Sequence, residues 1–418
     1  RDAGREGALD AAISGALSMQ TEADLAGFDA FPYPARDPDE ERQRLITGSP
    51  SHPLEIDHFV FAGKRRWAAG TRVLVAGGGT GDAVVQIAQV LTSANKPYHI
   101  TYLDLSRSAR QIAEARLKAR DLPDVTFVTG DLSRAAEYGP FDYIDCANVL
   151  QYCPDPAEAL AHLARALSPE GGLGLSLPAP YGMAALASLK ASLQRLVQGT
   201  PRERLRRAKA IVARLPESHP VHTIPALKDA LSTDAGFYQL LMHGPLQGFT
   251  IDALMALLEQ AGLHYIGTPQ PYLYDPARFM ADASLLKEIA PLDRMHLAEA
   301  LNGGLRSHVV YAAPNAERRV ARTDREAVPH LKGVSGEKLA QAASKSGVIP
   351  VSHSGMLAEI PVSAMASRCV ALVDGRRSLE AISEQCGLDA VAFSSIWRPL
   401  SETLTDFGLL HYSRLLHP

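Results

Sequence analysis

The sequence predicts an α/β protein built on a doubly wound, mostly parallel sheet. Short apolar runs alternate with segments of helical periodicity from about residue 71 onward. This alternation indicates βαβ units joined by right-handed crossovers. A glycine-rich turn over residues 77–81 follows the first apolar run directly. Open α/β sheets bind ligands at the carboxyl ends of their strands, so this turn marks the expected site.

The elements follow in order along the chain. Strands are expected at Val73–Ala76, His99–Leu103, Val125–Val128, Phe141–Asn148 and Leu173–Leu177, and helices at Ala83–Leu91, Ser108–Arg120 and Pro156–Leu167. The alternation lapses over about 181–247, which predicts a helical insertion that caps the sheet. It resumes with a helix at Ile251–Ala261 and strands at His264–Gly267 and His308–Ala313.

Two flanking regions extend this core, which we place at residues 65–315. Residues 1–64 are expected to form a helical and Pro-rich segment, beginning with an Ala-rich amphipathic helix to about residue 25. A polar stretch over 314–330 has the composition of a linker. Residues 331–418 contain two helical patterns and a terminal strand, which suggests a small winged-helix-like domain with a regulatory or partner-binding role. We expect the core to fold without this domain.

Composition excludes several classes of protein. The chain has 418 residues, of which 46% are apolar and 21% charged, as in globular proteins. Its net charge of −4 provides no basic excess for nucleic acid. No apolar run approaches the ~20 residues of a membrane span. Four dispersed cysteines form neither a disulfide framework nor a zinc motif, so we expect a cytoplasmic protein without a metal.

The glycine turn has the spacing GxGxG, at Gly77, Gly79 and Gly81. A P-loop requires Lys and Ser or Thr where Asp82 and Ala83 stand, and the dinucleotide motif GxGxxG requires glycine at Asp82. The observed spacing suits a cofactor without phosphate, whose amino-acid and ribose parts lie over the loop. Glycine permits this close approach and positive φ angles.

Two acidic residues follow the next strands. Asp104 ends the second strand, where a carboxylate can accept hydrogen bonds from both ribose hydroxyls. Asp131 follows Gly130 after the third strand and can accept from the exocyclic amine of adenine. Taken alone, Asp104 could be a helix N-cap and Asp131 a turn residue. Their joint register with the glycine turn favours a ligand site.

With these motifs, residues 65–315 resemble the class I S-adenosylmethionine-dependent methyltransferases. The resemblance rests on the glycine motif, the acidic end of the second strand, Gly130-Asp131 and the segment 141–152. It implies a Rossmann-like seven-stranded sheet of order 3-2-1-4-5-7-6 with an antiparallel seventh strand, and S-adenosyl-L-methionine as cofactor. The expected cofactor-binding residues are Tyr33, Ala76, Gly77, Gly78, Gly79, Gly81, Asp104, Leu105, Asp131, Leu132, Asn148 and Val149.

The chain departs from this family at Ala76, where many members carry an acidic residue that helps hold the methionine amino group. Backbone carbonyls of the loop would then do that work, which places more demand on Gly77 and Asn148.

Methyl transfer is an in-line displacement, so the protein mainly aligns the acceptor in a dry cavity. Asn148 and Tyr152 stand at the end of the fourth strand and are the expected catalytic residues, with Tyr152 able to orient an amine. Gln151, Tyr181 and His243 are expected to bind substrate. A packing role is the alternative for Tyr152, Tyr181 and His243.

Three functions remain open. Residues 31–34 resemble a segment of bacterial methyltransferases that are often fused to tetratricopeptide repeats. Residues 237–262 and 301–311 are similar to segments of those enzymes and of bacterial protein methyltransferases with a regulatory domain, which favours N-methylation of a protein or peptide side chain. The second hypothesis is a small-molecule methyltransferase with the insertion as a lid. The third is a catalytically inactive, cofactor-binding regulator. The expected partners are the methyl acceptor and, in a homodimer, a second copy of the chain. We expect neither a nucleic-acid partner nor a membrane span.

Overall fold

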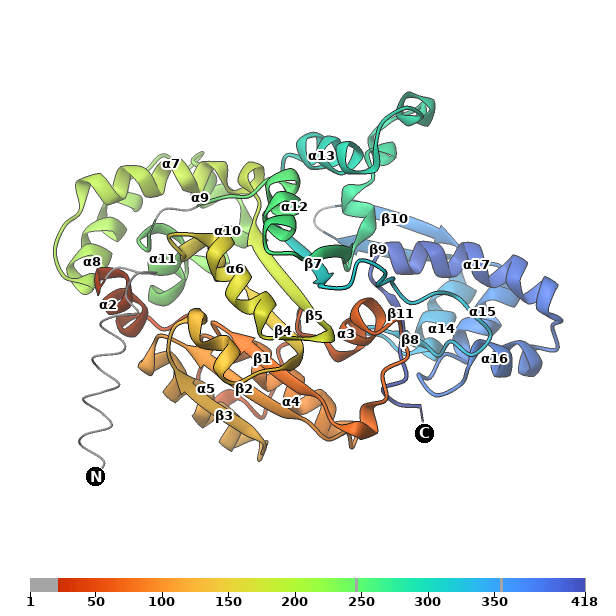
Figure 1. Ribbon diagram of the computed structural model, residues 1–418. Helices are drawn as coiled ribbons and strands as arrows, with labels where there is room; N and C mark the ends of the chain where they lie inside the picture. The colour runs from red at the N-terminus through yellow and green to blue at the C-terminus, as the bar shows by residue number, and fades with distance from the viewer. Residues whose placement is uncertain (1–21, 245–246, 354–355, 418) are drawn as a thin grey trace.

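The computed structural model describes residues 22–244, 247–353 and 356–417. Its centre is a seven-stranded sheet of order β3-β2-β1-β4-β5-β7-β6, in which β7 runs antiparallel to both neighbours (Figure 1). The predicted fold class and strand order are therefore confirmed. Most of the N-terminal helix expected up to about residue 25 lies outside the described residues.

All seven predicted strands are present. Their bounds are β1 Arg72–Ala76, β2 His99–Asp104, β3 Val125–Thr129, β4 Phe141–Ala147, β5 Leu167–Pro178, β6 His264–Gly267 and β7 Ser307–Ala313. Strand β5 begins earlier than expected, because Phe141 on β4 pairs with Leu167 before a register shift.

Helices cover both faces of the sheet. One face packs against α3 (Pro53–Val60), α4 (Asp82–Ser93) and α5 (Arg107–Ala119), and the other against α6 (Pro156–Arg165) and α12 (Ile251–Gln260). Alternate residues of β1 enter the two cores: Val73 and Val75 face the first set, and Leu74 and Ala76 the second. Burial on both faces explains the continuous apolar character of the parallel strands.

The insertion is helical, as predicted. It comprises α7 (Pro180–Leu196), α8 (Pro201–Val212), α9 (Pro220–Thr223), α10 (Pro225–Ala230) and α11 (Asp234–Leu241). Each of the first four helices begins with Pro at its first turn, where the missing N–H costs no hydrogen bond. These helices bury an apolar cluster of their own. The N-terminal α2 (Glu22–Ala30) contacts both α5 and α8 and so bridges the core and the insertion.

The C-terminal unit lies at the opposite end of the molecule from the insertion (Figure 1). Between them the chain forms α13 (Pro291–Asn302). The unit contains β8 (Pro329–Leu331), α14 (Gly336–Ser346), β9 (Val348–His353), β10 (Met356–Pro361), α15 (Ala364–Ala371), α16 (Leu379–Cys386), α17 (Ala390–Asp406) and β11 (Leu410–Tyr412). Both expected helices and the terminal strand are present. The winged-helix arrangement is not confirmed, because the β9–β10 hairpin precedes these helices and β11 pairs with β8.

This unit packs directly on α3, whose eight residues are all buried. The backbone N–H of Tyr412 donates to His58 Nδ1 at 2.9 Å, and Ser413 Oγ donates to Asp57 Oδ2 at 2.7 Å. The C-terminal residues therefore complete the layer that covers one face of the sheet. In the part of the chain that the structure describes, no helix has the length and apolar character needed to cross a bilayer.

Candidate active site

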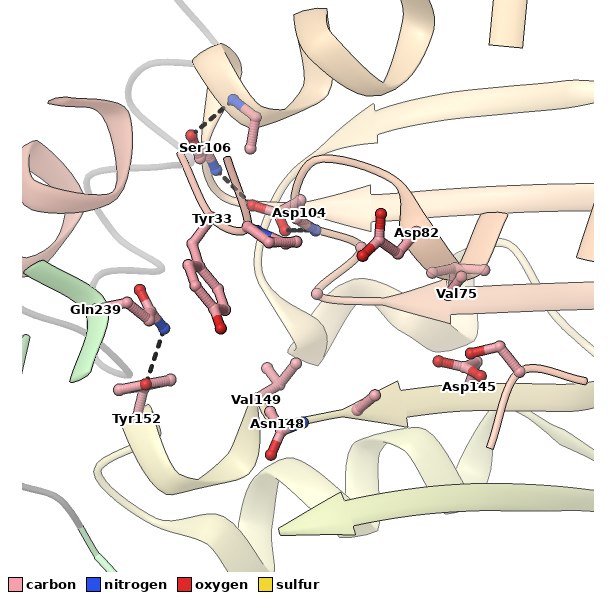
Figure 2. Close-up of a pocket in the computed structure, with 18 of the residues that line it drawn as sticks. Tyr33, Val75, Asp82, Asp104, Ser106, Asp145, Asn148, Val149, Tyr152 and Gln239 are labelled. Carbon is pink, nitrogen blue, oxygen red and sulfur yellow. Dashed lines mark hydrogen bonds between the residues drawn. The ribbon is translucent and has the colours of Figure 1, made fainter. Parts of the chain in front are cut away.

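A cavity of about 510 Å³ lies at the carboxyl ends of the parallel strands (Figure 2). Its floor is formed by the glycine loop after β1 and by the ends of β2, β3 and β4. Residues 46–51 close one side, and residues from α2, α7 and α11 close another. Such a cavity lies within the range of about 300–1,000 Å³ that is usual for small-molecule sites.

The glycine loop brings its backbone to the cavity surface. Gly77 and Gly79 have φ angles of 69° and 51°, in the left-handed region. A Cβ atom on Gly77 would lie 2.3 Å from Val149, and one on Gly78 would lie 2.3 Å from Tyr102. Glycine is therefore required at Gly77 by both conformation and space, and at Gly78 by space.

Gly81 has a different role from the one expected. It is absent from the cavity lining, and a Cβ there would meet Ala113 on α5 at 2.9 Å. Gly81 thus allows α4 and α5 to pack closely, and it starts α4 with a φ angle of 101°.

Asp104 joins the loop to the next βα turn. Its Oδ2 accepts from Gly79 N–H at 2.7 Å, and its Oδ1 accepts from Ser106 N–H at 2.8 Å (Figure 2). Burial raises the pKa of this carboxyl group, and the two backbone donors oppose that shift. A carboxylate has about four lone-pair sites, so both oxygens can still accept from a ribose.

The neighbouring turns supply the other predicted cofactor residues. Asp131 lines the cavity while its Oδ1 accepts from Ser133 N–H at 2.8 Å, so it caps the following turn as well. Leu105 and Leu132 line the same end of the cavity, and Asn148 and Val149 line it beside β4. Asn148 has a φ of 57°, a conformation that Asn tolerates better than most residues.

Tyr33 comes from the segment that follows α2. Its carbonyl oxygen accepts from Thr80 N–H at 3.3 Å, and Pro34 O accepts from Thr80 Oγ1 at 2.7 Å. Figure 2 shows the Tyr33 ring projecting into the cavity. The Pro-rich segment is thus hydrogen-bonded to the glycine loop, and it covers one side of the cavity.

Ala76 does not line the cavity. Its side chain is fully buried in the opposite core, beside Leu74 and Ile144. The preceding residue, Val75, faces the cavity instead. Successive side chains of a strand point to opposite faces of the sheet. Val75 and not Ala76 is therefore the residue at the end of β1 whose side chain can contact the cofactor.

Tyr152 lines the cavity just after the end of β4. Its hydroxyl accepts from Gln239 Nε2 at 2.8 Å, and Gln239 belongs to α11 of the insertion (Figure 2). The Phe28 ring meets the Tyr152 ring edge-on at 5.7 Å. Burial raises the pKa of Tyr152 to about 12, so the hydroxyl keeps its proton at neutral pH.

Two expected substrate residues lie outside the cavity. Tyr181 is 40% exposed at the start of α7, and Met183 from the same helix lines the cavity in its place. His243 is buried behind the wall, where it stacks on Phe28 with ring centroids 4.0 Å apart. It supports Phe28 without reaching the cavity surface.

A cluster of charged side chains at the start of α4 was not predicted from the sequence. Asp82, in the first turn of α4, accepts from Arg36 at 2.8 and 2.6 Å and from Arg116 at 2.8 Å. Burial alone would raise the pKa of Asp82, but the two guanidinium groups hold it below its usual value. Arg36 stands 46 residues before its partner, within a run of charges, so the sequence contained no local signal for this pair.

Among the lining residues that the structure describes, three further ones carry buried oxygens without a hydrogen-bond partner. They are Gln151 Oε1, Gln239 Oε1 and Asp145 Oδ2. Buried polar atoms in native structures are normally paired. Oxygens left unpaired on a cavity wall therefore indicate where a ligand donates hydrogen bonds.

Comparison with known proteins agrees with this geometry. Residues 74–173 match a family model described as a methyltransferase domain. The chain contains a class I S-adenosylmethionine-dependent methyltransferase domain. The backbone-lined loop, Asp104 and Asp131 fit its cofactor, because they offer close approach and acceptors for the ribose and adenine. When bound, S-adenosylmethionine supplies an electrophilic methyl group on a positively charged sulfur.

The relatives differ in how much of the chain they cover. An uncharacterized protein of Synechococcus sp. is 25% identical over 335 residues, 76% of this chain and 78% of that protein. Trans-aconitate 2-methyltransferase of Deinococcus radiodurans is 34% identical over 29% of this chain and 43% of that enzyme. The structure of PKMT2 from Rickettsia typhi in complex with AdoHcy matches with a TM-score of 0.63 and 14% identity, over 88% of this chain and 77% of that one.

Proposed function

We propose that this methyltransferase methylates an amine nitrogen on a protein or peptide side chain. The observation that carries the proposal is the pair of unpartnered amide oxygens, Gln151 Oε1 and Gln239 Oε1, on the cavity wall. Gln239 Nε2 donates to the Tyr152 hydroxyl at 2.8 Å, which orients the Gln239 side chain.

An amine matches this pair of acceptors. A neutral primary amine has two N–H groups and one lone pair, so it can donate to both oxygens while the lone pair stays free to attack. The nitrogen forms the new N–C bond as the electron pair of the S–C bond returns to sulfur, and the extra proton on nitrogen leaves to water. A carboxylate acceptor would bring negative charge against two carbonyl dipoles and would satisfy neither oxygen.

The rest of the wall suits a slender apolar chain that ends in nitrogen. Phe28, Tyr33 and Tyr152 place aromatic rings around this end of the cavity. Aromatic faces attract ammonium groups and stack well against methylene chains. An amine can therefore be held here before it loses its proton.

The likeness to PKMT2 supports a macromolecular acceptor. It extends over 88% of this chain, well beyond the sheet, and so includes much of the insertion and the C-terminal unit. None of the described residues of the C-terminal unit lines the cavity, so its proposed role is to present a partner from outside the cavity.

A small-molecule acceptor is the second candidate. It is favoured by the closure of the cavity by the insertion, through Met183, Gln239 and Leu240. In this alternative α7 and α11 act as a lid that opens for the substrate.

Transfer of a radiolabelled methyl group distinguishes these functions. The full chain is incubated with labelled S-adenosylmethionine and a bacterial lysate, and protein is then separated from small molecules. We expect label in protein, stable to mild alkali as N-methyl groups are. Label in the small-molecule fraction would favour the second candidate, and label released by alkali would indicate a carboxyl acceptor. Cofactor binding without any transfer would favour an inactive regulator.

Two variants test whether methyl transfer depends on the amide of Gln239. Gln239→Met keeps the length of the side chain and removes the amide, so we expect a large loss of transfer. Gln198→Met, on the exposed surface of the insertion, is the matched control and should transfer at the parent rate. Equal rates for the two variants would contradict the role of Gln239.

A further inference from the structure

Asp145 is a buried carboxylate on the cavity wall that the predicted site does not include. It lies on β4, is 1% exposed, and lines the cavity beside residues 46–51 (Figure 2). Ser51 hydrogen-bonds to the carboxyl group, but Oδ2 has no partner. A buried acidic oxygen that faces a ligand cavity without a donor is an unusual and costly arrangement.

The surroundings of Asp145 provide no cation among the described residues. The titratable groups on which Asp145 acts electrostatically are Tyr143 and Cys146 on its own strand and Tyr311 on β7. Burial raises the pKa of all three, so they are neutral at physiological pH. Gln86 of α4 also lines this part of the cavity, but its amide bonds to the backbone of Gly48. Burial without compensation raises the pKa of Asp145 to about 7.

The position of Asp145 in the sheet indicates which part of the cofactor lies beside it. Asp145 pairs with Val75 in the β1–β4 register, so the two side chains lie side by side on the same face below the glycine loop. Asp104 and Asp131 lie on the other side of β1, after β2 and β3. If those residues hold the adenosine part, the amino-acid part extends toward β4 and α4.

We infer that the Asp145 carboxylate binds the ammonium group of the cofactor's methionine part. Val75 is apolar and cannot serve this group, and the carboxylate on the adjacent strand reaches the same region of the cavity. A charge-assisted hydrogen bond to Oδ2 would satisfy the unpartnered oxygen and neutralise the buried charge. The inference rests on the cofactor and is independent of the proposed acceptor.

Calorimetry with two nucleosides tests the assignment on the full chain. S-adenosylhomocysteine carries the ammonium group, whereas 5′-methylthioadenosine keeps the adenosine and sulfur but lacks the amino acid. We expect Asp145→Asn to weaken S-adenosylhomocysteine roughly 10- to 100-fold, as for loss of a hydrogen bond between charged groups, and to leave 5′-methylthioadenosine unchanged. Asp104→Asn is the matched control and should weaken both ligands. Equal weakening of both ligands by Asp145→Asn, or no weakening, would overturn the inference.

Proton release gives a second readout. The raised pKa leaves the parent carboxyl group partly protonated near neutral pH, and an ammonium partner favours the charged form. Binding of S-adenosylhomocysteine at pH 7 should therefore release a fraction of a proton, measured from the binding enthalpy in buffers of different ionisation enthalpy. Asp145→Asn should abolish this release while keeping the parent fold, as judged by thermal unfolding. The same proton release from both proteins would refute the assignment. Neither measurement involves the acceptor, so a failure here leaves the proposed amine methylation untouched.

Discussion

At the scale of single residues, the acceptor end of the site depends on one hydroxyl. Tyr152 Oη accepts from Gln239 across 87 residues of sequence and thereby connects the end of β4 to the insertion. This bond orients the Gln239 amide and so places its free oxygen on the cavity wall. Tyr152 thus acts on the acceptor through Gln239 as well as by its own ring.

Tyr152→Phe tests this arrangement. The variant keeps the ring but leaves the Nε2 donor of Gln239 without its acceptor, so the Gln239 amide oxygen is no longer held in place. We expect slower transfer, with the affinity for S-adenosylhomocysteine kept within about threefold, roughly 0.7 kcal/mol. Steady-state kinetics and calorimetry measure the two quantities. Unchanged turnover would reduce Tyr152 to a packing residue, and a collapse in affinity would place it on the cofactor side.

Sequence reasoning located residues whose role follows from their place in a βαβ unit. Asp104 and Asp131 were identifiable because each directly follows a predicted strand, and the structure places both on the cavity. Arg36, Asp145 and Gln239 were not identifiable in this way. Their roles depend on contacts between distant segments or, for Asp145, on which side of a strand faces the cavity.

At the scale of elements, the glycine loop is shaped by the strands on either side of it. Tyr102 on β2 donates its hydroxyl to Gly79 O at 2.6 Å, and its ring fills the space beside Gly78. Tyr102 thereby stabilises the loop conformation in which the backbone faces the cavity.

Gly78→Ala should break this fit. Its Cβ would lie 2.3 Å from the Tyr102 ring, which is buried and cannot move aside easily. Overpacking of this kind costs about 1–3 kcal/mol, and we expect a lower thermal midpoint and weaker binding of S-adenosylhomocysteine. Gly48→Ala, on the same cavity, meets nothing within 4 Å and is the control. Parent-like binding by Gly78→Ala would show that the loop adapts.

The elements that the sequence predicted well are those with local periodicity. The strands and helices from β1 to β5 each carry their own pattern, and βαβ chirality leaves few arrangements for them. In contrast, α14, α15 and the β9–β10 hairpin were missed. The hairpin strands include Pro350 and Pro361 and show no regular alternation, so their pairing depends on the packing of the C-terminal unit as a whole.

At the scale of the whole molecule, the C-terminal unit and the sheet share a buried interface. Asp57 of α3 accepts from Ser413 Oγ and from Arg414 N–H, and both contacts come from the last residues described. Lys332, next to β8, pairs with Glu55 of α3 and donates to Ser49 on the cavity wall at 3.4 Å. The C-terminal unit thus supports both α3 and the segment that closes the cavity.

A chain that ends at residue 318 should therefore be impaired, although the sequence favoured an independent core. Truncation removes the donors Ser413 and Arg414 from Asp57 and the donor Tyr412 from His58, and it exposes the buried face of α3. We expect aggregation or a marked fall in thermal midpoint, together with loss of S-adenosylhomocysteine binding by calorimetry. A truncated chain that binds with parent affinity would show that the interface is dispensable.

The same interface predicts a pH dependence of stability. Burial lowers the pKa of His58 to about 4 and that of His330 to about 4, against an unfolded value near 6.5. A histidine with a lowered pKa stays neutral in the folded state, so its contribution is complete above pH 6.5. As the pH falls from 6.5 toward 4, the unfolded chain binds protons that the folded chain does not, and stability is lost.

His58→Gln isolates this effect. Glutamine can still accept from Tyr412 N–H through its amide oxygen, but it does not titrate. Between pH 6.5 and 5 the parent should lose up to about 1.4 kcal/mol per pH unit more than the variant, measured from thermal unfolding at a series of pH values. The raised pKa values of Asp57 and Asp145 act in the opposite direction, and both proteins share them. The His411 ring lies 5.2 Å from that of His58, and a charge on His58 lowers the pKa of His411, so the difference between the two slopes reports His58 together with its effect on His411. His222→Gln, at an exposed position of the insertion, should follow the parent curve. Parallel curves for His58→Gln and the parent would mean that His58 takes up its proton without opening the interface.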